Sequence, residues 1–461
     1  MPGGRPNIVL ILADDMGYGD FGALGDGWAR TPAIDGLMAE GLCLTHHYSG
    51  SAVCAPARAA LLTGRYPHRT GAVDTLEGRG LDRLALRERT IADLLRAAGY
   101  ATGAVGKWHL GALDPRYHPN ARGFDEFVGF RGGWSDYYRW RLDRNGAFEA
   151  GDGRYLTDVL TDEAVSFIRR HNRGPFFLHV AYNAPHFPFQ APEEDVRAFR
   201  ARGLNTGLSI LYAMVARMDA GVGRILETLR EQGLEDGTLV LFTSDNGPQM
   251  SGEGDMAIHR FNGWLHGQKG QVFEGGIRVP AAVRWPDGLP GGGRQQHGAV
   301  HFTDWLPTLL HAAGVPAPAG LPLDGRDALP LLRGEAGLAD IPRFWQWNRY
   351  TPEVRSNAAV SAGGWKLVRP AIRESMRLAA ADAEMDRRLK YEPEAFSDIR
   401  RDPEPERSLP EPPPPLLYHL AEDPYERTDL AAAEPERVAR LLRQLEDWFA
   451  AVEADRRSIA D

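Results

Sequence analysis

The chain has 461 residues, of which 43% are hydrophobic and 25% charged, a composition typical of a globular protein large enough to bury a sizeable core. Its net charge of -9 argues against nucleic acid or an anionic membrane as the main partner, although a local basic pocket for a small anion is compatible with it. The only two cysteines, Cys43 and Cys54, exclude a disulfide framework, and no stretch approaches the roughly twenty apolar residues of a membrane span.

The N-terminal segment MPGGRPNIVLILADD contains an apolar run of strand length. It has no charged n-region, no long apolar h-region and no small-residue cleavage site. We therefore expect no signal peptide and a cytoplasmic location, while noting that a chain trimmed of its leader would look the same.

Four runs that are apolar throughout predict buried parallel strands. In chain order they are NIVLILA (7–13), ATGAVGKWH (101–109), PFFLHVAY (175–182) and TLVLFTS (238–244). Helical patterns separate them, around Ala92, Val159 and Val215. We expect an α/β catalytic domain over residues 1–334, built on a large, mostly parallel sheet flanked by helices.

The segment SAVCAPARAALLTGRYPHRTG (51–71) lies between the first two predicted strands. Pro56 suits the first turn of a helix, so Cys54 is expected at the N-terminal edge, where free N–H groups favour an anion. Arg58 falls on the same side one turn later. A packed cysteine at a helix start and a thiolate nucleophile are alternatives at this point. Cys43, in GLCLTHHY, is expected to be a buried small hydrophobe.

The pattern changes after about residue 334. GGWKLVRP (363–370) and LLYHLAEDPYERTDLA (416–431) predict strands with a turn at Asp423 and Pro424, and Pro435–Arg457 predicts a long amphipathic helix. We expect a smaller C-terminal α+β subdomain over 335–461. Its charged, Pro-rich insertion at 372–411 predicts a helix followed by an extended linker, and the composition does not decide between an active-site cover, an oligomer contact and a solvated excursion.

Each predicted strand of the large sheet ends in polar residues, where ligands bind in open α/β sheets. Taken singly, each ending reads as a turn or a cap; together they predict a site. The oxygen ligands among them, suited to Ca²⁺ or Mg²⁺, are Asp14, Asp15, Asp245 and Asn246. The basic residues are Arg58, Lys107, His109 and His186. A hard cation ringed by basic side chains indicates a site for a sulfate or phosphate ester.

These residues stand in motifs that resemble the type I, formylglycine-dependent sulfatase family of the alkaline phosphatase superfamily, in particular arylsulfatases. The central match is Cys-x-Pro-x-Arg at Cys54, Pro56 and Arg58, followed by Thr63 and Gly64. The other matches, in family order, are PNIVLILADDMGYGDFG, TPAIDGLMAEG, GKWHLG, APHFPF, TSDNG, GQKGQVFEGGIRVP and HFTDWLPTLL. With the C-terminal LLYHLAEDPYERTDLA, they span nearly the whole chain.

The resemblance implies that Cys54 is a precursor, oxidised by a formylglycine-generating enzyme to an aldehyde whose hydrate attacks sulfur and then expels sulfate. It implies Ca²⁺, with Mg²⁺ as the alternative, bound by Asp14, Asp15, Asp245, Asn246 and modified Cys54. Arg58 would hold the formylglycine, Lys107 would contact it and the sulfate, and His109 would be the base. It also implies that His186 and Lys269 bind sulfate and assist departure of the alcohol.

The substrate implied is an aryl or carbohydrate sulfate monoester. Ser135, in GGWSDYY, is a loose candidate for a polar contact to the formylglycine. The aromatic blocks GFRGGWSDYYRW and FWQWNRY either stack on a substrate ring or pack as ordinary loops. Two alternatives stand beside the sulfatase reading: a phosphonate monoester or phosphodiester hydrolase of the same superfamily, and a silent binding protein whose Cys54 stays unmodified. The oligomeric state is not predicted.

Overall fold

The structure is a computed structural model that describes residues 4–461. The predicted catalytic domain and the segment tested for a signal peptide both begin in residues 1–3, which lie outside the described residues. No helix among the described residues is long and apolar enough to cross a membrane.

Within residues 4–461, ten strands form one large sheet in the order β11-β2-β10-β9-β1-β8-β4-β5-β6-β7. Their bounds are β1 (Asn7–Ala13), β2 (Leu42–Leu44), β4 (Ala101–Lys107), β5 (Glu126–Phe130), β6 (Arg141–Arg144), β7 (Ala147–Ala150), β8 (Phe176–Ala181), β9 (Thr238–Ser244), β10 (Ala281–Arg284) and β11 (Arg294–Gln296). The strands from β9 to β5 are mutually parallel, whereas β10, β6 and β7 pair antiparallel. The predicted large, mostly parallel sheet is confirmed, and its four predicted strands are the central neighbours β9, β1, β8 and β4.

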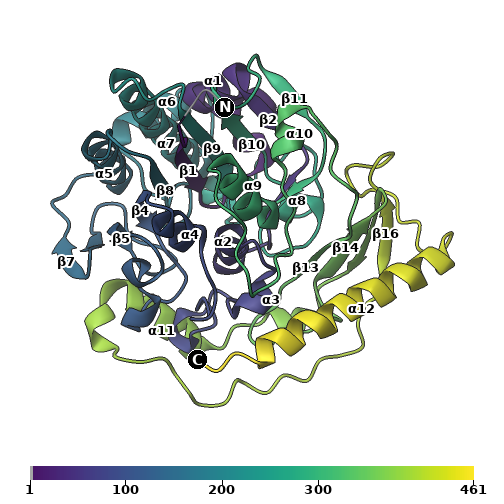
Figure 1. Cartoon of the computed structure of the whole chain (residues 1–461). Coiled ribbons are helices and arrows are strands. Elements are labelled where there is room, and N and C mark those ends of the chain that lie inside the picture. The colour runs from purple at the N-terminus through teal and green to yellow at the C-terminus, as the bar shows by residue number, and fades with distance from the viewer. Residues whose placement is uncertain (1–3) are drawn as a thin grey trace.

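Helices cover both faces of this sheet (Figure 1). One face packs against α1 (Pro32–Glu40), α5 (Leu156–Arg170), α6 (Glu193–Arg200) and α7 (Thr206–Glu231). The other packs against α2 (Cys54–Thr63), α4 (Ile91–Ala97), α9 (Trp305–Ala312) and α10 (Leu329–Arg333). Along β1, Val9 and Ile11 enter the first core while Ile8 and Leu10 enter the second. Because both faces are buried, the strand is apolar throughout and not alternating.

A second, antiparallel sheet lies at the side of the molecule with α12 (Pro435–Arg457) along it (Figure 1). Its strands, in order, are β13 (Arg343–Gln346), β14 (Ala358–Ala362), β15 (Trp365–Arg369) and β16 (Leu416–His419). Leu367 of β15 and Leu445 of α12 belong to one buried core. The predicted α+β character of the C-terminal part is confirmed, whereas the domain boundary at 334/335 stays a prediction.

The remaining short strands and α-helices of the described chain are β3 (His47–Tyr48), β12 (Val300–His301), α3 (Pro67–Thr70) and α8 (Glu274–Ile277). Two features of the C-terminal part were not as expected: strands β13 and β14 were missed, and the strand predicted after the Asp423–Pro424 turn is absent from the described chain. There Asp429 Oδ1 accepts the backbone N–H of Leu417 at 2.9 Å, so that a side chain occupies the position of a strand partner.

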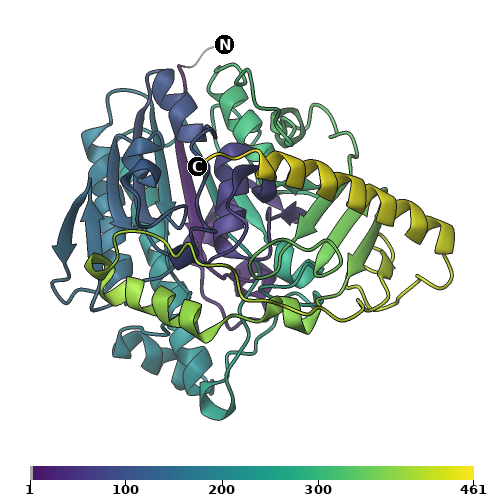
Figure 2. The same ribbon diagram turned by 90° about the horizontal axis from the view of Figure 1, so that it is seen from below.

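The insertion contains α11 (Ala380–Tyr391), followed by an irregular, extended segment up to residue 415. This confirms the predicted helix and linker. Figure 2 shows α11 away from the small sheet and beside the large one, with the linker running back across the molecule towards β16.

Candidate active site

The polar segments predicted to meet do lie at one edge of the large sheet, because β9, β1, β8 and β4 are adjacent and parallel. In strand order, the chemistry-bearing residues at their carboxyl ends are Asp245 and Asn246, Asp14 and Asp15, His186, and Lys107 with His109. All of them are buried.

The acidic residues form a compact, fully buried cluster. Asn246 Nδ2 donates to Asp15 Oδ1 at 2.8 Å, and the backbone N–H of Asp15 donates to Asp245 Oδ1 at 3.2 Å. Asp15 has a φ of 66°, a left-handed conformation that a non-glycine residue adopts at a cost. The surrounding contacts therefore hold this carboxylate in a fixed place.

Cys54 is the first residue of α2, as predicted, and is 2% exposed. Its Sγ–H donates to Asp14 Oδ1 at 3.6 Å. Candidate ligand atoms of Asp14, Asp15, Cys54 and His186 all lie within 4.8 Å of one another. The N-terminus of α2 thus points its first residue into the acidic cluster.

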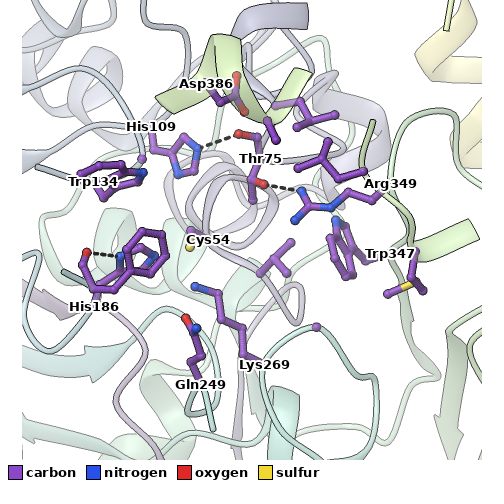
Figure 3. Close-up of a pocket in the computed structure, with 18 of the residues that line it drawn as sticks. Cys54, Thr75, His109, Trp134, His186, Gln249, Lys269, Trp347, Arg349 and Asp386 are labelled. Atoms are coloured by element: carbon purple, nitrogen blue, oxygen red, sulfur yellow. Dashed lines mark hydrogen bonds between the residues drawn. The ribbon is translucent and has the colours of Figure 1, made fainter. Parts of the chain in front are cut away.

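Two lysines lie against the two aspartates after β1. Lys107 Nζ is 2.6 Å from Asp14 Oδ2, and Lys269 Nζ is 2.7 Å from Asp15 Oδ2. Figure 3 shows the Lys269 side chain directed towards Cys54. Both lysines thus place positive charge beside Cys54, where a bound oxyanion would be neutralised.

Arg58 joins the cluster from the next turn of α2. Its Nη2 lies 2.7 Å from Asp245 Oδ2 and 3.8 Å from Asp14 Oδ1, and its Nη1 donates to the Lys107 carbonyl at 3.3 Å. The guanidinium is 1% exposed. It therefore ties the helix that carries Cys54 to the ends of three strands.

Burial and the neighbouring cations act in opposite directions on the pKa values of the carboxyl groups. It raises the pKa of Asp14 to about 7, an effect that Lys107 opposes and Asp245 reinforces. Burial also acts to raise the pKa of Asp15, but Lys269 and His186 outweigh it, so this pKa is lowered. Each of the three carboxylates of the cluster is paired with a cationic side chain, Asp14 with Lys107, Asp15 with Lys269 and Asp245 with Arg58.

The donor set fits a hard divalent cation. Within the described residues, the buried oxygen Asn246 Oδ1 has no hydrogen-bond partner, although the amide nitrogen of the same side chain has two. An unpartnered buried acceptor among carboxylates is what a metal ligand looks like without its ion. The oxygen-rich set suits Ca²⁺ or Mg²⁺ better than Zn²⁺.

The tautomer of His109 follows from its contacts. Its Nε2 lies 3.2 Å from the Thr75 carbonyl, which only accepts, so Nε2 carries the proton. Nδ1 is buried without a partner among the described residues and is left with its lone pair. Burial, followed by the cations Lys107, Lys390 and Arg58, holds the pKa of His109 well below its usual value. His109 is therefore a neutral imidazole with a free basic nitrogen, held at a φ of 56°.

His186 has the opposite arrangement. Its Nδ1 donates to the Phe187 carbonyl at 2.8 Å, and its Nε2 lies 3.7 Å from Asp15 Oδ2. Burial and Lys269 lower the pKa of His186, while Asp15 acts to raise it. Nε2 is thus the nitrogen of His186 that can exchange a proton within the site.

A cavity of about 720 Å³ opens over Cys54 (Figure 3). His109, His186 and Lys269 line it, together with amide side chains that include Gln249. Its volume is in the range of small-molecule sites.

Some side chains of the two aromatic blocks line the cavity, and others pack in a buried core. Trp134 and Trp347 line the cavity, whereas Trp345 is buried in a core beneath the small sheet. Ser135 lines a separate cavity of about 240 Å³, and its hydroxyl donates to the Asp136 carbonyl at 3.4 Å. Ser135 is not among the residues around the Cys54 cavity, so the structure does not support its predicted contact.

The sequence reasoning missed a second group of lining residues, which come from the loop after α3 and from the C-terminal part of the chain. It comprises Thr75, Glu77, Arg349, Asp386 and Lys390. Thr75, Glu77, Asp386 and Lys390 stand in none of the matched motifs and follow no predicted strand, whereas Arg349 stands in the aromatic block FWQWNRY. The charged composition of the insertion was the one available signal, and it did not indicate which face turns inward.

Cys43 lies in β2 and is 4% exposed, and both cysteines are free. Burial raises the pKa of the Cys43 thiol to about 11, so this residue stays an unreactive thiol. Its predicted role as a buried small hydrophobe is confirmed.

The chain resembles known proteins in both sequence and fold. The family description "Sulfatase" matches residues 6–315. Human arylsulfatase A is 34% identical, with 96% of this chain and 87% of that protein covered.

Two solved structures extend the comparison. The structure of Ps i-CgsB in complex with k-i-k-neocarrahexaose is 31% identical, with a TM-score of 0.80 and coverage of 96% of this chain and 92% of that one. Phosphonate monoester hydrolase of Agrobacterium radiobacter, at 24% identity, a TM-score of 0.64 and coverage of 98% and 96%, shares the fold.

Proposed function

This chain belongs to the sulfatase family and is a sulfuric ester hydrolase, and on that premise we propose that it cleaves sulfate monoesters through an aldehyde hydrate made from Cys54 beside a calcium ion. The observation that carries the proposal is the position of Cys54. It lies at the start of a buried helix, within reach of carboxylates that suit a cation and of lysines that suit an oxyanion.

Modified to formylglycine and hydrated, residue 54 would supply one hydroxyl that attacks sulfur and a second whose deprotonation expels sulfate. Arg58 orients this residue, because its guanidinium is fixed between Asp245 and the Lys107 carbonyl. A positive charge so close to the hydrate also stabilises the developing alkoxide.

The residues that would hold Ca²⁺, with Mg²⁺ as the alternative, are Asp14, Asp15, Asp245, Asn246 and modified Cys54. When bound, the ion would act as a Lewis acid on the sulfate and favour ionisation of the attacking hydroxyl. In this proposal the ammonium groups of Lys107 and Lys269, which pair with Asp14 and Asp15, also form ion pairs with the sulfate oxygens.

Two histidines move the protons. His109 accepts the proton of the second hydroxyl at Nδ1, the nitrogen left free by the hydrogen bond to Thr75. His186 Nε2, which faces the cluster, first takes up a proton, a change that Asp15 favours, and the resulting imidazolium gives this proton to the departing alcohol with the assistance of Lys269. The neutral state of His109 is the one that a general base needs.

The substrate class proposed is an aryl or carbohydrate sulfate. Trp134 and Trp347 give the cavity aromatic surfaces on which a ring can stack, and Gln249 adds an amide that can bond hydroxyl groups. Human arylsulfatase A supports the aryl sulfate, and the complex of Ps i-CgsB with k-i-k-neocarrahexaose supports the carbohydrate sulfate.

A phosphonate monoester or phosphodiester hydrolase is the second candidate, since one such enzyme shares the fold. Parallel kinetics on 4-nitrophenyl sulfate, 4-nitrophenyl phosphate and a phenylphosphonate monoester separate the two. We expect the highest kcat/KM for the sulfate; a clear preference for the phosphonate would replace the sulfatase assignment.

Mass spectrometry of the peptide around Cys54 tests the nucleophile and excludes the silent binding protein. We expect formylglycine in protein from a host with a formylglycine-generating enzyme. An unmodified thiol in a fully active preparation would contradict the mechanism. The cytoplasmic location and the catalytic domain of residues 1–334 remain predictions, to be checked by cell fractionation and limited proteolysis.

A further inference from the structure

The insertion forms one wall of the cavity over Cys54. Side chains from α11 and the segment before it line that cavity, namely Met376, Leu378, Ala383, Asp386, Arg387 and Lys390. Of the three roles that the sequence left open for the insertion, this placement supports an active-site cover. One buried carboxylate also connects a side chain of this wall to His109.

That carboxylate is Glu77, which is 3% exposed. Its Oε1 accepts the backbone N–H of Gly133 at 2.6 Å, forms an ion pair with Lys390 Nζ, and lies 3.7 Å from His109 Nε2. The Lys390 side chain is 4% exposed. A charged group on α11 is therefore linked through Glu77 to the protonated nitrogen of the predicted base.

The chain around Glu77 is fixed by the C-terminal part on both sides. Arg349 Nη1 donates to Thr75 Oγ1 at 2.7 Å, beside the carbonyl that holds His109. On the other side, the Gly78 N–H donates to Asp386 Oδ1 at 2.8 Å. Thr75 and Glu77 are thus presented to the imidazole by residues more than 250 positions away in the sequence.

We propose that Glu77 and Lys390 are a positioning pair for His109, through which the insertion controls the step that releases inorganic sulfate. The inference rests on the proposed function. In that step the hydroxyl proton on residue 54 passes to His109 Nδ1, the bond from carbon to the sulfate oxygen breaks with its electrons going to sulfate, and the hydroxyl oxygen becomes a carbonyl.

The pair works because the two charges act together on the imidazole. Glu77 attracts the Nε2 proton and so keeps Nδ1 as the free base. Alone, its charge would also favour the imidazolium, which cannot accept a proton. Lys390 cancels this effect, and it is one of the groups that lower the pKa of His109. The other charged groups acting on this ring are Lys107 at the end of β4 and Arg58 of α2.

The test uses the full, matured chain with 4-nitrophenyl sulfate and the variants Lys390→Met, Glu77→Gln and their combination. In Lys390→Met we expect kcat to fall about tenfold to a hundredfold while kcat/KM changes less than about threefold, since sulfate release and not sulfur attack is slowed. A burst of nitrophenolate equal to the enzyme concentration should precede the slow phase. The double variant should have the same kcat and kcat/KM as Glu77→Gln, because the role of Lys390 is to offset the charge of Glu77.

Arg388→Met is the matched control, since Arg388 is on the same helix, 42% exposed and paired with Glu392. It should leave all kinetic constants unchanged, and Lys390→Arg should restore most of kcat. Equal behaviour of Lys390→Met and Arg388→Met, or a parallel fall of kcat and kcat/KM without a burst, would overturn the proposal.

A measurement that does not depend on turnover tests the positioning pair independently of the proposed function. The ¹⁵N NMR titration of His109, assigned with His109→Gln, should move to higher pH in Lys390→Met and not in Arg388→Met. An unchanged titration refutes the pair even in an active enzyme. A wild-type enzyme silent towards every sulfate ester, with the titration shifted as expected, refutes the function alone.

Discussion

The ammonium group of Lys366, on β15 of the small sheet, lies 2.8 Å from Glu274 Oε1 at the start of α8, and neither side chain is exposed to more than 1%. Lys366 has a second partner, Glu426, at 2.8 Å. This buried triad joins the small sheet to α8, which lies outside that sheet. Glu274 keeps a second cation, Arg278, whose Nη1 lies 3.6 Å from Glu274 Oε2, so removing the Lys366 ammonium leaves Glu426 as the buried carboxylate without a cationic partner.

We therefore expect Lys366→Met to destabilise the fold by about 3–5 kcal/mol. Urea unfolding followed by circular dichroism and tryptophan fluorescence measures the loss. The control is Arg401→Met, which breaks a pair that is more than half exposed and should cost less than about 1 kcal/mol. Equal effects of the two changes would mean that the triad does not hold the small sheet to α8.

Cys54→Ser tests the precursor role of the cysteine in a host that modifies only cysteine. The serine fits the same buried position at the start of α2, so the variant should fold and bind metal. Its turnover should fall by about a thousandfold or more, because the hydrate cannot form. The rate on 4-nitrophenyl sulfate measures the loss of turnover, and a thermal melt shows whether the variant folds. Near-normal turnover would refute the mechanism.

Calcium binding should depend on Asn246, whose Oδ1 is the unpartnered acceptor in the cluster. Ca²⁺ at a hundredfold excess over its Kd should stabilise the wild type by about 2.7 kcal/mol and raise its Tm. Asn246→Ala should lose most of this gain, and chelation should lower both Tm and activity in the wild type. Asn172→Ala should respond like the wild type, because the Asn172 amide donates to Gln232 Oε1 at 2.7 Å and Gln232 is not a residue of the cluster. Repeating the melts with Mg²⁺ identifies the preferred ion.

A stability change with pH is expected from Asp82, which is fully buried near Glu77 and Asp386. Burial, with these two carboxylates, raises the pKa of Asp82 to about 7, from 3.8. Between these values the native state keeps a proton that the unfolded chain has lost, so the Asp82 contribution to stability falls as pH rises from about 4 to 7.

Asp82→Asn should therefore be more stable than the wild type at pH 8, on the order of 2–4 kcal/mol, and the difference should vanish near pH 4. Chemical denaturation at several pH values measures it. Asp287→Asn, at an exposed site, should leave the slope unchanged. A constant difference across the range would contradict the assignment.

Gly133 leaves room for the contact between His109 and Glu77. A Cβ at this position would lie 2.7 Å from His109 Cε1 and 3.0 Å from Glu77 Oε1. We expect Gly133→Ala to displace the imidazole and lower kcat about tenfold to a hundredfold. Gly174→Ala, where no atom lies within 4 Å of the added carbon, is the control. Unchanged kcat in Gly133→Ala would show that the ring position is not critical.

Much of the fold was predictable from local pattern. Strands such as β1 and β9 are apolar throughout because both faces of the large sheet are covered, and that pattern is visible in the sequence. β14 was missed because its residues, AAVSA, are small and form a strand only by pairing with β13 and β15. The false strand after Asp423 shows the reverse: a strand-like sequence in which Asp429 takes the place of a partner.

The residues of the site also fall into those that the sequence predicts and those that it does not. Asp14, Asp245 and Cys54 were predicted because strand ends and a helix start place them, and the sheet order then brings them together. Glu77 and Lys390 were not, because they are separated by 313 positions and their pairing depends on how the insertion folds back over the large domain. No local pattern carries that information.

Burial of the helix that begins at Cys54 also sets an order of events in the cell. All ten residues of α2, including Pro56 and Arg58, are buried. If Cys54 is oxidised as proposed, the maturation enzyme would have to bind this stretch as an accessible peptide, and the folded protein offers none. Oxidation of Cys54 would then compete in time with folding, and a chain that folds first would keep its thiol. The active fraction of any preparation would then report how fast the host modifies nascent chains, and adding the maturation enzyme to folded protein would not recover it.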